Sequence, residues 1–271
     1  MLSEQSIPLI RATLPAVGAA LGEITTRFYA GMFQAHPELL RDLFNRGNQA
    51  NGEQQKALAG SIASFATLLV ERPDARPDAM LSRIANKHAA LGVTSEQYKI
   101  VHEHLFAAIV DVLGDAVTPE VAAAWDEVYW LMAGALIAAE TRLYQERRLA
   151  EGDVWRRMEI TERNEETADA VSFVLRPADG SAAESFRPGQ YVSVQVELPD
   201  GARQIRQYSL SSAPGRGQWR ITVKRVHEPA APDGEVSTWL HRNARVGTVL
   251  TTSAPFGDLV LPDGDGPLLL A

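Results

Sequence analysis

The strongest candidate for chemistry in this sequence is His88, which lies on the apolar face of a predicted helix. Together with His88, the apolar residues Leu81, Ile84 and Leu91 recur at spacings of three or four residues along that face. Asp78 is a candidate N-terminal cap of this helix and Gly92 a candidate C-terminal cap. A histidine that points into a core either hydrogen-bonds to a neighbour, which is the commoner case for a lone histidine, or binds a ligand.

Two other predicted helices supply groups that would satisfy a buried imidazole. Thr94 and Gln97 have the spacing of a capping box, which places Tyr98 at the inner start of the next helix. Glu140 falls on the apolar stripe of the long helix predicted from about Pro119 to Arg148. A buried carboxylate needs a hydrogen-bond donor, and the second ring N–H of a metal-bound histidine is such a donor.

Three further candidates lie nearer the N-terminus, and each has an ordinary structural alternative. Tyr29 is on the inner side of a helical segment, where its hydroxyl needs a partner that a backbone carbonyl could supply. Phe44 closes a short turn and would usually be a plain core residue. Gln54 lies near the start of the following helix, but Asn51 and Gln54 have the spacing of a capping pair, which alone would explain both residues.

After Trp155 the pattern changes to short alternating strands separated by turns rich in proline and glycine, which predicts an antiparallel β-barrel or sandwich. Arg206 and Tyr208 fall on one face of a predicted strand, where a cation beside an aromatic plane can hold the phosphate and ring of one ligand. Gly234 and Ser237 open a short predicted helix whose free N–H groups suit a pyrophosphate. Each motif alone is weak, because surface strands and serine-capped helices often look similar.

These patterns divide the chain into two domains. Residues 1–147 form an all-α domain of six or seven helices, residues 148–154 a charged linker and residues 155–264 the β domain. The end of the chain, 265–271, includes GPLLLA, which is typical of the first strand of a nicotinamide-binding α/β domain. No glycine-rich phosphate-binding turn follows that strand.

Composition restricts the class of protein. A length of 271 residues, with 45% hydrophobic and 22% charged residues, is typical of globular domains. The net charge of −8 argues against a nucleic-acid surface. With no apolar run of membrane-spanning length, no signal peptide and no cysteine, we expect a cytoplasmic protein without stable membrane association. We also expect a monomer, and any metal must be held by nitrogen or oxygen ligands or enter within a cofactor.

Four motifs, taken in chain order, resemble those of bacterial flavohaemoglobins, the nitric oxide dioxygenase family. They are RFYAGMF, LFNRGNQANGEQQKAL, RIANKHAALGVTSEQYKIVHEHL and RQYSL, and the resemblance covers the whole chain. It implies an all-α globin domain that binds haem b, followed by an antiparallel β-barrel FAD-binding domain of the ferredoxin reductase type.

The resemblance also implies roles for the candidate residues. His88 would be the proximal ligand of the haem iron, with Tyr98 and Glu140 as its hydrogen-bond partners. Tyr29 would bond the iron-bound oxygen, Phe44 would lie against the haem, and Gln54 and Leu58 would cover its distal face. The implied FAD contacts are Tyr191, Arg206, Gln207, Tyr208, Ser209, Gly234, Val236 and Ser237.

The implied activity is nitric oxide dioxygenation, in which haem-bound O2 reacts with NO to give nitrate and electrons pass from NAD(P)H through FAD to the haem. Because no glycine-rich turn follows Leu270, the NAD(P)H site of the family is expected to be absent from this chain. The alternative is therefore a truncated haem and flavin protein that binds oxygen or senses redox state without self-sufficient turnover.

Overall fold

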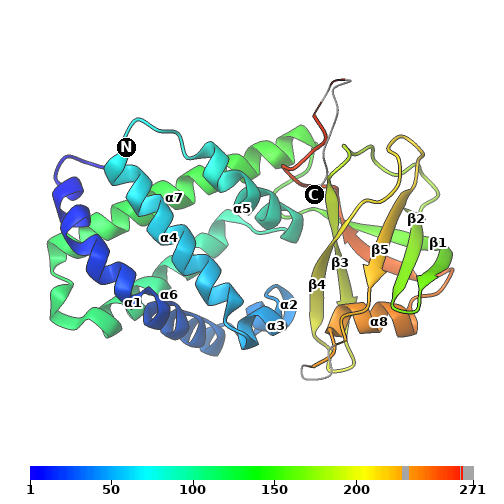
Figure 1. The fold of residues 1–271 in the computed structure, drawn as a ribbon, viewed down its shortest axis with the longest axis horizontal. Coiled ribbons are helices and arrows are strands. Elements are labelled where there is room, and N and C mark those ends of the chain that lie inside the picture. The colour runs from blue at the N-terminus through cyan, green and yellow to red at the C-terminus, as the bar shows by residue number, and fades with distance from the viewer. Residues whose placement is uncertain (228–231, 263, 265–271) are drawn as a thin grey trace. The chain divides into compact units, whose positions relative to one another are not determined.

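The computed structural model describes residues 1–227, 232–262 and 264, and it separates into a helical unit and a strand-rich unit (Figure 1). The first unit contains residues 1–154 and 196–206, and the second contains residues 155–195 and 207–271. The strand predicted at 265–271 lies outside the described residues.

The first unit contains the helices that the periodicity predicts. They are α1 (Ser6–Ala35), α2 (Pro37–Asp42), α3 (Arg46–Ala50), α4 (Glu53–Glu71), α5 (Asp78–Leu91), α6 (Ser95–Leu113) and α7 (Pro119–Glu146), with a short 3-10 helix, η1 (Gly114–Ala116), after α6. Helix α5 ends at Gly92, whose φ of 73° is the left-handed conformation of a C-terminal cap, and α6 begins with the predicted capping box of Thr94 and Gln97. The prediction for Asp78 was wrong, because Pro77 is the N-cap and Asp78 is the first helical residue.

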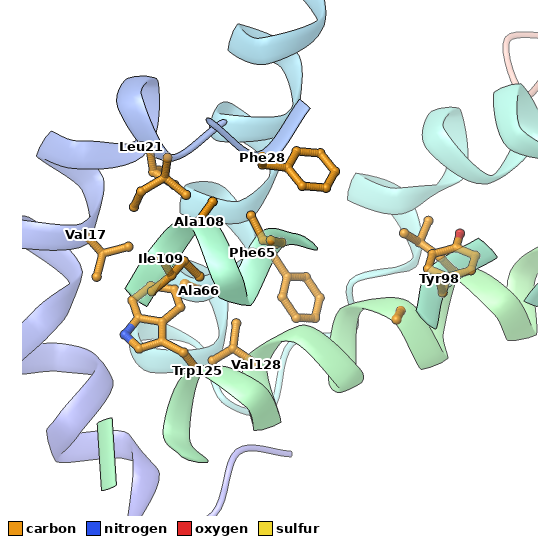
Figure 2. Close-up of a cluster of buried hydrophobic side chains, with 14 of the residues drawn as sticks. Val17, Leu21, Phe28, Phe65, Ala66, Tyr98, Ala108, Ile109, Trp125 and Val128 are labelled. Carbon is orange, nitrogen blue, oxygen red and sulfur yellow. The ribbon is translucent and has the colours of Figure 1, made fainter. Parts of the chain in front are cut away.

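Long apolar stripes from α1, α4, α6 and α7 meet in one core (Figure 2). Phe28 and Phe65 are 1% exposed, and Val17, Ile109 and Trp125 are also buried there. The indole N–H of Trp125 donates to the hydroxyl of Thr13, so this large side chain is buried with its polar atom satisfied.

By length and composition alone, α1 and α7 could each cross a membrane, which the sequence reading did not expect. This is weak evidence for a membrane span, because core helices of soluble proteins pass the same test. Both helices contribute buried residues to the core of the first unit, including Ile24 from α1 and Leu136 from α7.

The strands form the predicted antiparallel β domain. They are β1 (Trp155–Thr167), β2 (Ala170–Pro177), β3 (Tyr191–Glu197), β4 (Arg203–Ser209), β5 (Trp219–Lys224) and β6 (Val249–Ser253), in the sheet order β4-β3-β6-β1-β2-β5. Leu210, directly after β4, makes an antiparallel bridge with Ile221 in β5. This bridge joins the two ends of the strand order, so the sheet closes into a barrel.

The barrel interior is filled by large side chains that are at most 2% exposed, among them Met158, Phe173, Trp219 and Phe256. Helix α8 (Glu235–Asn243) lies between β5 and β6 in the chain and buries Val236 and Leu240 completely. At the turn before β3, Gly189 has a φ of 99°, and a Cβ there would overlap the carbonyl oxygen of Leu259.

Candidate functional site

His88, Tyr98 and Glu140 come together from three helices of the first unit. The Nδ1 atom of His88 lies 2.9 Å from Glu140 Oε1 and 2.9 Å from the Tyr98 hydroxyl. That hydroxyl donates to the same carboxylate oxygen at 2.6 Å. Because a carboxylate only accepts, Nδ1 carries the hydrogen, and the lone pair of the ring is on Nε2.

Burial of this group determines which of its atoms carry hydrogen. Glu140 is 3% exposed and Tyr98 is 7% exposed. Burial, followed by the nearby charge of Glu140, raises the pKa of Tyr98 well above its usual value, so its hydroxyl stays a neutral donor. Two donors therefore converge on one buried carboxylate, which satisfies the requirement that its position on the apolar stripe predicts.

The turn between α5 and α6 holds His88 and Tyr98 in place. Two tyrosines of α7 that the sequence reading did not select contribute to this. The hydroxyl of Tyr144 donates to the Val93 carbonyl at 2.9 Å, and that of Tyr129 donates to the Tyr98 carbonyl at 2.6 Å. Tyr144 lies four residues after Glu140 and thus on the same helix face, a spacing that would have identified it.

The geometry of His88 fits an iron ligand. Its side chain is 31% exposed, and within the described part of the chain Nε2 has no hydrogen-bond partner. No group of three or more His, Asp or Glu residues among the described residues could hold a metal ion. A haem, which brings four ligands to its own iron, needs only one such imidazole from the protein.

Tyr29, Phe44 and Gln54 form a second group in the same unit. The Tyr29 ring lies 5.8 Å from Phe44 and 5.6 Å from Phe33, a residue that the sequence reading did not select. Burial raises the pKa of Tyr29 to about 12, and a hydrogen bond with the Gln54 side chain acts in the opposite direction. The phenol is therefore a neutral donor that faces an amide.

The capping alternative for Gln54 was wrong. Gly52 is the N-cap of α4, and the Asn51 side chain accepts from the N–H of Glu53 instead of pairing with Gln54. Leu58, one turn further along α4, is partly buried and packs against the helical core, as does Phe44. An apolar wall with a tyrosine and an amide suits a small polar ligand on iron.

Exposure to solvent alternates along the strand that carries four of the flavin candidates. Arg206 and Tyr208 in β4 are partly buried, whereas Gln207 and Ser209, which follow each of them, are exposed. This alternation agrees with the prediction that Arg206 and Tyr208 share one face. Tyr191 in β3 exchanges two backbone hydrogen bonds with Phe256, at 2.8 and 2.9 Å, which fixes its position on the barrel.

The start of α8 fits a phosphate group. Gly234 is the N-cap, and a Cβ there would lie 2.7 Å from both Ser237 Oγ and Val226 Cβ, so only glycine fits. The hydroxyl of Ser237 accepts from the N–H of Val226 and donates to the carbonyl of Gly234. This hydroxyl therefore shapes the turn.

Other groups at the start of α8 are left for a ligand. The side chain of Val236 is fully buried, which leaves its backbone N–H as the group it can offer. Thr238 Oγ1 is buried and has no partner among the described residues. An unpaired hydroxyl next to the positive end of a helix fits a pyrophosphate, and the sequence reading did not select this threonine.

Comparison with known proteins agrees with both units. The Globin family matches residues 26–136, and the Oxidoreductase FAD-binding domain family matches residues 157–260. The flavohemoprotein of Rhizobium meliloti is 44% identical over 96% of this chain and 65% of its own length. That of Chromobacterium violaceum is 42% identical over 100% of this chain and 67% of its own length.

A solved structure gives the same result in three dimensions. The crystal structure of flavohemoglobin from Malassezia yamatoensis, with bound FAD and heme, matches with a TM-score of 0.86 and 42% identity, over 96% of this chain and 65% of that one. The chain thus spans about two thirds of the length of these relatives. It belongs to the flavohemoprotein family.

Proposed function

We propose that this protein binds haem b at His88 and FAD on the β-barrel, and that it acts as a nitric oxide dioxygenase. The observation that carries the proposal is the hydrogen-bonded group of His88, Tyr98 and Glu140, which leaves one imidazole nitrogen for a metal. The haem iron supplies the O2-binding centre and FAD supplies single electrons, so that NO, O2 and one electron give one nitrate ion.

On the proximal side, Glu140 fixes the tautomer and the orientation of His88. A carboxylate that accepts from Nδ1–H increases the basicity of Nε2 and strengthens its donation to a metal. Tyr98 shares the same carboxylate oxygen and so moderates that effect. The result is a strongly donating ligand, which favours the ferric state.

On the distal side, Tyr29 would offer its hydroxyl hydrogen to a ligand on the haem. Its pKa of about 12 keeps this hydrogen in place at neutral pH. Gln54 orients the phenol, and the partly buried side chains of Phe44 and Leu58 limit access by water.

On the barrel, Arg206 and Tyr208 would hold the phosphate and the ring of FAD, and Tyr191 in β3 and Gln207 and Ser209 in β4 would contact it. The backbone N–H groups of Val236 and Ser237 at the start of α8 receive the pyrophosphate, with Thr238 as an additional donor. The FAD and heme bound in the relative from Malassezia yamatoensis support both assignments.

A single-turnover experiment tests the proposal. The purified protein should show haem and flavin absorption bands. After reduction with dithionite and removal of the excess, it should bind O2 and then convert one equivalent of NO to nitrate. His88→Gly should lose the reaction, and added imidazole should restore haem ligation. A wild-type protein that binds haem but yields no nitrate would overturn the proposed activity.

We further propose that the substrates are O2 and NO and that the protein works as a cytoplasmic monomer without nucleic acid or a membrane. The net charge of −8 supports the exclusion of nucleic acid. Sedimentation of the holoprotein at micromolar concentration measures the oligomeric state, and cell fractionation measures the location. A dimer, or protein recovered with the membranes, would contradict this part.

A further inference from the structure

The buried side chain of Gln204 binds the turn that joins α2 to α3 in the first unit. It is 1% exposed. Its Nε2 lies 3.0 Å from the carbonyl oxygen of Arg41, 3.2 Å from that of Phe44 and 3.3 Å from that of Leu40. Its Oε1 accepts from the backbone N–H of Arg46 at 3.3 Å and from the Arg206 guanidinium at 3.4 Å. One amide therefore reaches both sides of the turn.

This turn needs such support because its helices are short. α2 has six residues and α3 has five, and neither has a fully buried residue. Helices of this length are unstable in isolation, and their terminal carbonyl and N–H groups lack partners within the helix. Gln204 supplies a donor to the last turn of α2 and an acceptor to the first residue of α3.

Phe44 lies in the chain between these two helices, and its ring faces Tyr29 and Phe33. Its ring is 5.8 Å from Tyr29 and 5.2 Å from Phe33. The backbone position of Phe44 therefore sets how its ring packs against the proposed oxygen donor. A shift of the turn would move the ring and change the space beside Tyr29.

We propose that Gln204 is a positioning residue of the distal haem pocket, which acts through Phe44 and touches neither cofactor nor substrate. This inference rests on the proposed function. Only glutamine suits the position, because the three carbonyls require a donor and the N–H of Arg46 requires an acceptor. Glutamate at neutral pH would lose the donor, and asparagine would be one methylene too short.

An ion pair made by the neighbouring residue of the same strand provides a matched control. Arg203, the residue before Gln204, donates to Asp42 at 2.7 Å, and its side chain is 54% exposed. Arg203→Met removes this ion pair between the same strand and the end of α2 but leaves all five hydrogen bonds of Gln204. Since Asp42 is 14% exposed but keeps its bonds from the Arg41 guanidinium and from the backbone N–H of residue 203, the control should alter neither the turn nor the pocket.

The test compares Gln204→Met, Gln204→Asn and Arg203→Met with the wild type. Amide hydrogen exchange of the segment 40–46, measured on the haem-free protein, should be at least tenfold faster in both Gln204 variants and unchanged in Arg203→Met. In the haem-loaded protein, the rate of oxygen release should change at least threefold in the Gln204 variants alone. If Gln204→Met does not fold, Gln204→Asn carries the same two measurements.

Epistasis with Phe44 gives the decisive result. In a Phe44→Leu background, Gln204→Met should have no further effect on oxygen release, because the ring through which it acts is gone. An additive effect, unchanged release in both Gln204 variants, or an equal change in Arg203→Met would each overturn the inference. A wild-type protein that binds no haem would refute the proposed function instead. The hydrogen-exchange measurement on haem-free protein would still show whether Gln204 holds the turn.

Discussion

Replacing Glu140 with glutamine should raise the reduction potential of the haem. The amide has the shape of the carboxylate, so His88 Nδ1–H and the Tyr98 hydroxyl both keep an acceptor. What is lost is the charge. A hydrogen bond to a charged group contributes about 1.5–3 kcal/mol and a neutral one about 0.5–1.5 kcal/mol, so the bond from His88 weakens by about 1 kcal/mol.

The sign of the shift in reduction potential follows from the charge of the iron, because ferric iron is more positive than ferrous iron and gains more from a strongly donating ligand. A weaker bond to Glu140 reduces donation from Nε2 and destabilises ferric iron relative to ferrous iron. Since 59 mV corresponds to about 1.4 kcal/mol for one electron, the potential should rise by about 40 mV. Tyr98→Phe should lower the potential, because the carboxylate then interacts with His88 alone.

Spectroelectrochemical titration of the haem-loaded protein measures these shifts. Glu146→Gln is the matched control, because it removes one exposed negative charge from the same helix and should leave the potential unchanged. A potential that is unchanged or lower in Glu140→Gln would refute the reasoning. So would a shift of equal size in the control.

Three further predictions concern the same unit. His88→Ala should abolish haem incorporation while flavin content stays near normal, and absorption spectra that show equal loss of both would contradict this. Tyr29→Phe should release oxygen several-fold to tenfold faster, since one hydrogen bond of about 1 kcal/mol is lost, and stopped-flow release at the wild-type rate would show that Tyr29 faces elsewhere. Stability of the haem-free protein should fall between pH 10 and 12: burial raises the Tyr29 pKa to about 12 from an unfolded value near 10, so stability is unaffected by this group below pH 10 and drops by roughly 3 kcal/mol as pH rises through 12. The urea midpoint of the wild type should therefore fall relative to that of Tyr29→Phe over that range, and parallel curves would contradict the assignment.

The group of His88, Tyr98 and Glu140 could be predicted because two of its members are polar residues at positions where the helical pattern calls for apolar ones. His88 and Glu140 are polar residues on apolar stripes, and each stripe is readable within its own helix. Each such residue requires a buried partner, which made their meeting a reasonable hypothesis. The distances of 2.6–2.9 Å come from the packing of three helices and were not readable from spacing.

The errors and omissions have a different cause. Asn51 and Gln54 have capping spacing, but Gly52 between them takes a φ of 78° and becomes the cap, which moves the helix start by one residue. Gln204 was missed because its partners are about 160 residues away in the chain. On a strand, a buried glutamine between an arginine and an isoleucine gives no sequence signal that separates it from a surface residue.

The two sides of the proposed haem pocket are therefore held by different forces, which has a functional consequence. The helices around His88 are long and fixed by buried stripes, so changes there act on the hydrogen bond to Glu140 and hence on the potential. The helices around Phe44 bury no residue fully and depend on polar contacts from Gln204. Because those contacts do not involve His88, Gln204→Met should alter the rate of oxygen release without moving the reduction potential. Glu140→Gln should mainly shift the reduction potential. Ligand retention and electron affinity would then be adjustable by separate substitutions in one chain.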